Sequence, residues 1–188
     1  QVLNSDHALE LDRLPKSMIV IGGGVIGTEW ASLLSDFGVR VTVVEAQDRI
    51  LPFEDEDVSR EMARLLKKRG VQLLTGAKLI AEDVQLSNGA VTLRVEHRGE
   101  RKDISGERVL LSVGRRACID DIGLANTDVV VKNGFIEVNP FMQTAESHIY
   151  AIGDVVGGYQ LAHVASREGI IAVEHMAGLN PAPLDARK

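Results

Sequence analysis

The stretch Ile19–Glu29 constrains this chain more than any other, because an apolar run is followed at once by a glycine-rich turn and a helical pattern. Gly22, Gly24 and Gly27 fall at the spacing G-x-G-x-x-G. In that spacing the first glycine permits a tight turn, the second lets a pyrophosphate approach the backbone, and the third lets the helix pack on the strand. A second apolar run ends in Glu45, 21 residues after Gly24. This order of strand, turn, helix, strand and acid predicts a dinucleotide-binding unit.

Glu45 indicates which dinucleotide fits. A carboxylate at the end of the second strand can accept hydrogen bonds from both hydroxyls of an adenosine ribose. A 2′-phosphate there would bring like charges within ~4 Å, a repulsion of about 4 kcal/mol at an effective dielectric of 20 before solvent weakens it. Arg49 is the one nearby cation that would soften this repulsion, and we expect it to be a solvated loop charge. The sequence therefore favours NAD(H) over NADP(H).

The composition argues against several other classes of function. The chain has 188 residues and a formal net charge of −6 without a basic stripe, so neither a nucleic acid nor an anionic membrane surface is expected as a partner. No apolar run reaches the ~18 residues of a membrane span. The five histidines show no ligand spacing, so no metal site is predicted. The single cysteine, Cys118, cannot form an internal disulfide, and a cytoplasmic location is expected.

The remaining pattern predicts an α/β fold, with a Rossmann-like parallel sheet, helices, and an antiparallel β-meander in place of one crossover. The meander is expected over residues 77–104, where Asn88-Gly89 and Arg98-Gly99 are turn signals. Short apolar runs predict further strands at 71–74, 109–113 and 149–152, a hairpin joining 129–131 to 135–138, and helices between 54 and 70 and over 162–177.

Several motifs, taken in this order, resemble those of the pyridine nucleotide–disulfide oxidoreductases. They are Leu14-Pro15-Lys16-Ser17, the glycine turn, Val113-Gly114-Arg115 and Ile149-Tyr150-Ala151-Ile152-Gly153-Asp154. Leu161-Ala162-His163, followed by Ala165 and Glu168-Gly169, makes the chain most similar to the dihydrolipoamide dehydrogenase (lipoamide dehydrogenase) branch. The resemblance covers almost the whole chain, and it is specific through the combination of motifs.

The resemblance implies two cofactors, NAD and FAD, and a role for each matching position. The NAD pyrophosphate would lie on the turn formed by Gly22, Gly23, Gly24, Val25, Ile26 and Gly27. Val25 would also gate the nicotinamide pocket, Glu29 would approach the nicotinamide, and Glu45 would hold the adenosine ribose. Leu79 would line the adenine side, and the backbone of Gly114 would touch the cofactor. In the FAD site, Asp154 would bind the ribitol, with Leu161, Ala162 and His163 near the flavin.

The chain also departs from the family pattern. The family's redox chemistry needs two cysteines four residues apart on an earlier FAD-binding stretch, and a later domain with the dimer interface and a His–Glu acid/base pair; this sequence contains none of them. No catalytic residue is therefore predicted. Cys118, where the family usually carries the Asn of an Arg-x-Pro-Asn loop, is expected to be a loop substitution. We expect a piece of a longer protein, with an NAD-binding domain over 1–139 and an incomplete FAD-binding domain over 140–188.

The activity implied for the parent protein is NADH formation from dihydrolipoamide, through a disulfide and FAD, in a homodimer that belongs to a 2-oxoacid dehydrogenase complex. The piece itself is expected to bind NAD(H), to lack turnover, and to self-associate through apolar surface of residues 140–188. Two alternatives stay open. One is another enzyme of the superfamily, such as a mercuric reductase or a soluble transhydrogenase, and the other is a stand-alone, non-catalytic NAD-binding or redox-sensing module.

Overall fold

A computed structural model describes residues 1–87 and 89–185, which form two compact units that divide after Gly114. The elements of unit 1 are β1 (Val2–Leu3), α1 (Ser5–Leu9), β2 (Ser17–Ile21), α2 (Val25–Asp36), β3 (Arg40–Glu45), α3 (Glu56–Lys68), β4 (Gln72–Thr75), β5 (Ala77–Ser87), β6 (Ala90–His97), β7 (Glu100–Gly106) and β8 (Arg108–Leu111). Those of unit 2 are η1 (Leu124–Asn126), β9 (Val131–Lys132), β10 (Phe135–Ile136), η2 (Gly153–Val156) and α4 (Ala162–Met176). Asn88 of the predicted Asn88-Gly89 turn lies outside the described residues.

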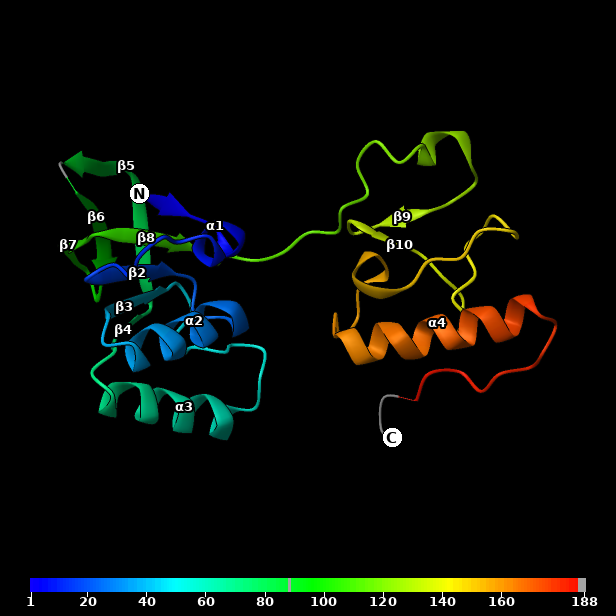
Figure 1. The fold of residues 1–188 in the computed structure, drawn as a ribbon, viewed down its shortest axis with the longest axis horizontal. Helices are drawn as coiled ribbons and strands as arrows, with labels where there is room; N and C mark the ends of the chain where they lie inside the picture. The colour runs from blue at the N-terminus through cyan, green and yellow to red at the C-terminus, as the bar shows by residue number, and fades with distance from the viewer. Residues whose placement is uncertain (88, 186–188) are drawn as a thin grey trace. The chain divides into compact units, whose positions relative to one another are not determined.

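The centre of unit 1 is a five-stranded parallel sheet in the order β1-β8-β2-β3-β4. Its middle strand β2 is apolar on both faces. Met18 and Val20 pack with residues of α2 and α3, whereas Ile19 and Ile21 pack with residues of the meander. Parallel strands that are buried on both faces have nearly continuous apolar sequences. This explains why apolar residues predominate in β2 and β3. Figure 1 shows α2 and α3 on one side of this sheet and β5–β7 on the other.

The second layer of strands is the antiparallel meander β5-β6-β7. Alternate residues of β6 point toward the parallel sheet, and Val91, Leu93 and Val95 are almost fully buried there. The predicted fold class is therefore confirmed: an α/β unit in which an antiparallel meander covers one face of a parallel sheet. None of the helices in the described ranges is long and apolar enough to span a bilayer.

Unit 2 corrects one prediction. Helix α4 forms as expected, and the predicted hairpin is reduced to β9 and β10. The predicted strand over 149–152 does not form; Tyr150 makes only an isolated bridge with Gln143. The run pairs with residues 142–144 through two backbone hydrogen bonds, from Ala151 to Met142 and from Thr144 to Ile149, and this pairing is too short to make a strand. The proposed domain boundary between 139 and 140 stays a prediction.

The parallel topology fixes where a site can lie in unit 1. Strands β2, β3 and β8 run in one direction, so Gly22, Glu45 and Ser112 are brought together at their carboxyl ends. Ligands of open α/β sheets bind at this edge. The predicted glycine turn and its acid are thus placed at the same edge by the fold.

Candidate functional site

The glycine turn after β2 is shaped by two positions that accept no side chain. Gly22 has a φ of +103°, and a Cβ there would come 2.3 Å from the carbonyl oxygen of Ser112. A Cβ on Gly27 would come 1.9 Å from the carbonyl oxygen of Gly22. The first glycine therefore allows the turn, and the third allows α2 to lie against it, as the sequence spacing predicts.

Gly24, in contrast, faces open space. No atom lies within 4 Å of a Cβ built at this position. Gly24 is also the N-cap of α2, no side chain caps the helix, and its first turn has no acidic residue. Within residues 1–87 and 89–185, no acceptor is hydrogen-bonded to the amides of Gly24, Val25, Ile26 or Gly27. Open backbone amides with the positive end of a helix dipole form an anion-binding arrangement.

Glu45 is tied to this turn. Its side chain is only 8% exposed, and Oε2 accepts a hydrogen bond of 2.6 Å from the amide of Gly23. Oε1 accepts a second bond of 2.7 Å from the amide of Gln47. The carboxylate thus joins the turn to the loop that follows β3. A carboxylate has about four acceptor positions, so two further bonds to ribose hydroxyls are compatible with these contacts. The ribose assignment itself stays a prediction.

The loop after Glu45 supports the turn from the other side. The amide of Leu51 donates to the carbonyl of Gly23 at 2.7 Å, and Leu51 adopts a left-handed φ of 49°. Arg49, expected to be a solvated charge, is half-buried and donates to the carbonyls of Pro52 and Glu54. The expectation was wrong because the guanidinium closes its own loop.

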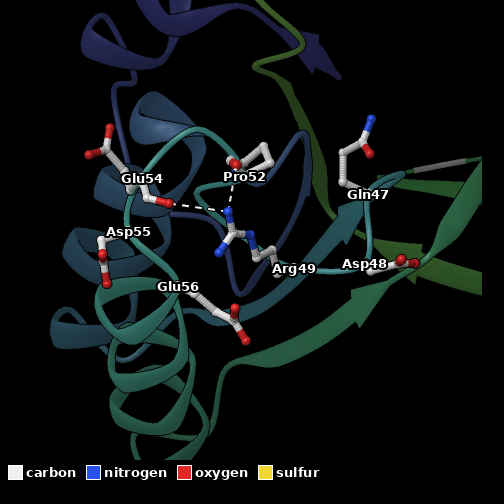
Figure 2. A pocket seen from close by; sticks show the side chains of 7 residues that line it. All are labelled: Gln47, Asp48, Arg49, Pro52, Glu54, Asp55 and Glu56. Carbon is white, nitrogen blue, oxygen red and sulfur yellow. Dashed lines mark hydrogen bonds between the residues drawn. The ribbon is translucent and has the colours of Figure 1, made fainter.

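Figure 2 shows this loop where it borders a cleft of about 600 Å³. The cleft is lined by Gln47, Asp48, Arg49, Pro52, Glu54, Asp55 and Glu56. Four carboxylates against one guanidinium disfavour a phosphate there. The uncapped start of α2 is therefore the better phosphate site of the two.

The other residues predicted for the NAD site lie as follows. Val25 is 52% exposed, and Glu29 is exposed on α2 without a hydrogen bond or ion pair to any described residue. Gly114 has a φ of +136° and open space around its Cβ position, two residues after Ser112. Leu79 is half-buried in the meander against the core. The structure thus brings the turn, Glu45 and the segment leading to Gly114 together, whereas Leu79 packs against the core between the sheet and the meander.

The residues predicted for the FAD site all lie in unit 2. Asp154, in η2, forms an ion pair of 2.7 Å with Arg115. The preceding amide of Gly153 donates to the carboxylate of Glu168, which is only 6% exposed on α4. Leu161, Ala162 and His163 are exposed at the start of α4. Asp154 pairs through Oδ2, which leaves Oδ1 as an acceptor for a sugar hydroxyl, and Ala162 is small and exposed. These residues fit a sugar and a planar ring; their roles stay predictions.

Metal binding has no structural support in the part of the chain that the structure describes. No group of three or more His, Cys, Asp or Glu side chains is placed to hold an ion in residues 1–87 and 89–185.

Comparison with known proteins agrees with this geometry. The family model described as "Pyridine nucleotide-disulphide oxidoreductase" matches residues 1–169. The chain belongs to this family. Among the family's curated members, it is 59% identical over 184 residues to a dihydrolipoyl dehydrogenase of Bacillus subtilis, and 39% identical over 186 residues to a dihydrolipoyl dehydrogenase of Geobacillus stearothermophilus. Each match covers 98% of this chain but 39% of the relative.

Solved structures of the family show the same fold. LpdA from Mycobacterium tuberculosis matches with a TM-score of 0.88 at 31% identity, covering 98% of this chain and 39% of that one. The HOCl-induced flavoprotein disulfide reductase RclA from Escherichia coli matches with a TM-score of 0.87 at 28% identity, covering 97% and 41%. The chain therefore spans about two fifths of the length of these relatives.

Sequence reasoning missed two residues that shape these sites. Ser112 contacts the glycine turn from the end of β8, and Glu168 holds the backbone before Asp154. Ser112 lies 90 residues from Gly22, so no local pattern joins them. Glu168 appeared only as part of a motif, and nothing else in the sequence indicated that this carboxylate is buried.

Proposed function

We propose that this chain binds NAD(H) on the turn Gly22–Gly27, with Glu45 at the adenosine ribose. The observation that carries the proposal is the open space at Gly24 beside the uncapped amides of α2. The remaining assignments follow the family position by position: Val25 and Glu29 at the nicotinamide, Leu79 at the adenine and Gly114 along the cofactor.

We propose that the longer protein to which this chain belongs has dihydrolipoyl dehydrogenase activity. In this reaction, dihydrolipoamide is oxidised through a disulfide and FAD, and NAD is reduced. FAD, when bound, supplies the two-electron relay between the disulfide and the nicotinamide. Asp154 and the residues 161–163 would contribute to holding it. Support comes from the dihydrolipoyl dehydrogenase names of the relatives. A homodimer, membership of a 2-oxoacid dehydrogenase complex and a cytoplasmic location are part of the same proposal, and this chain alone is proposed to be inactive.

Titration of the chain with NADH, followed by calorimetry or nicotinamide fluorescence, tests the binding proposal. We expect saturable binding, and at least tenfold weaker binding by Gly24→Ala, because a Cβ at Gly24 would occupy the space where the phosphates approach the backbone. Ala90→Gly, a change of similar size on β6 in the meander, should leave the affinity unchanged. A wild-type chain that shows no saturable binding of NADH would contradict the proposal.

We also propose that copies of this chain self-associate through residues 140–188. Helix α4 exposes Ile170 by 49%, Val173 by 63% and Met176 by 56%, at a spacing of three residues that places them on neighbouring turns. Light scattering should show a mass above 20.4 kDa that rises with concentration. Val173→Lys should restore the monomer, whereas Val130→Lys, at a 44% exposed site outside this segment, should not. A wild-type monomer at high concentration would contradict the proposal.

A further inference from the structure

The support of the glycine turn includes a side chain that none of the predicted site residues accounts for. Ser112 follows β8, and its amide continues the β2–β8 pairing by donating to the carbonyl of Ile21 at 2.8 Å. Its hydroxyl lies 2.9 Å from the same carbonyl and 3.0 Å from the carbonyl of Gly22. The hydroxyl proton therefore reaches two consecutive carbonyls at the point where the chain leaves β2.

The carbonyl of Gly22 occupies a narrow position. The hydroxyl of Ser112 and the Cα of Gly27 both lie close to this oxygen, and a Cβ on Gly27 would come 1.9 Å from the oxygen and 2.7 Å from Ser112 Oγ. The peptide that joins Gly22 to Gly23 is thus fixed at its oxygen by Ser112, while the amide of Gly23 is fixed by Glu45. These two contacts fix the orientation of the Gly22–Gly23 peptide plane, and Gly23 joins this peptide to Gly24.

External contacts matter here because the turn contains three consecutive glycines. Glycine has no side chain and the largest conformational freedom of any residue, so three consecutive glycines do not restrain the backbone by themselves. A binding loop that is already held in its bound conformation loses less entropy when the ligand arrives, and this raises the affinity. A hydroxyl that fixes the first peptide of the turn therefore acts on pyrophosphate binding without touching the ligand.

We propose that Ser112 is a positioning residue for the dinucleotide site: its hydroxyl holds the Gly22 carbonyl so that the amides from Gly24 onward face the pyrophosphate. This inference rests on the proposed binding of NAD(H). Ser112→Ala removes one hydrogen bond, and we expect NADH to bind about threefold to tenfold more weakly. Ser112→Thr keeps the hydroxyl, so its affinity should stay within twofold of the wild type.

A matched control separates positioning from general loss of stability. Ser35, near the other end of α2, also donates its hydroxyl to a backbone carbonyl, that of Ser32 at 2.8 Å. Ser35→Ala should lose a similar amount of stability and keep its NADH affinity. A second readout needs no ligand: amide hydrogen exchange at Gly23, whose N–H donates to Glu45, should be faster in Ser112→Ala and unchanged in Ser35→Ala.

The outcomes are distinguishable. If the wild type binds NADH and Ser112→Ala binds it equally well, the inference is overturned and the proposed function stands. If Ser35→Ala weakens binding as much as Ser112→Ala, the effect is general and the inference is also overturned. If the wild type does not bind NADH, the proposed function fails, and faster exchange at Gly23 in Ser112→Ala then supports the positioning of the turn on its own.

Discussion

Replacing Gly27 by alanine is expected to lower the free energy of unfolding by about 3 kcal/mol, the upper end of the usual cost of overpacking. The new Cβ would lie 1.9 Å from the carbonyl oxygen of Gly22, a backbone atom that cannot rotate away as a side chain does. Gly22 is in turn held by its own amide, which donates to the carbonyl of Val44 at 2.8 Å. Urea unfolding followed by circular dichroism measures the change, and the thermal midpoint should fall by roughly 10 °C.

Gly24→Ala is the matched control, because it adds the same methyl group three residues earlier in the same turn. Its Cβ would meet no atom within 4 Å, and its φ of −71° suits any residue. The free energy of unfolding should change by less than about 1 kcal/mol, the usual range for exchanges at an N-cap. The two variants should therefore show different defects. Gly27→Ala should lower the free energy of unfolding, whereas Gly24→Ala should keep its stability and bind NADH more weakly. Equal stability of both variants would show that α2 does not press on the turn as described.

The glycine turn was predictable because the residues that determine it lie close together in the sequence. The spacing of Gly22, Gly24 and Gly27 between an apolar strand and a helix fixes a turn, and parallel pairing of β2 with β3 then places Glu45 beside it. The meander was predictable for the same reason, since alternating side chains and turn signals lie within one short stretch. In these places, local preference and tertiary structure agree.

What could not be predicted depends on partners far along the chain. The hydroxyl of Ser112 reaches the turn only because β8 is inserted beside β2, so nothing near Gly22 in the sequence indicates the contact. The run 149–152 is the reverse case, because a strand was predicted there and did not form. Its residues favour a strand, but a strand needs a neighbour paired along its length, and in residues 1–87 and 89–185 the run has a single bridge, between Tyr150 and Gln143.

The carboxylate of Glu45 makes contacts within the protein besides the ribose contact that is proposed for it. It was predicted to face a sugar, and the structure shows it accepting bonds from the amides of Gly23 and Gln47. These amides belong to the turn and its loop, so the acid lies beside the turn and outside the two apolar clusters. Because the contacts use one acceptor position on each oxygen, the same carboxylate can hold the turn and still accept from ribose hydroxyls. Its negative charge would repel a 2′-phosphate in either case.

Glu45→Gln is therefore expected to have two measurable effects. The amide side chain has one acceptor oxygen in place of two, so either Gly23 or Gln47 loses its bond, and the free energy of unfolding should fall by about 1–3 kcal/mol. Loss of the charge should also lower the ratio of NADPH to NADH dissociation constants about tenfold, since the repulsion of a 2′-phosphate disappears. Parallel titrations with both nucleotides measure this ratio. Glu82→Gln, the same change at an exposed site on β5, should leave stability and ratio unchanged.

The two effects of Glu45→Gln also separate the two functions of the carboxylate. A fall in stability with an unchanged nucleotide ratio would mean that Glu45 holds the turn and does not face the ribose. An altered ratio at unchanged stability would mean that the bonds to Gly23 and Gln47 contribute little to folding. Both effects together are expected, because the carboxylate that accepts from the amide of Gly23 is also the group proposed to face the ribose.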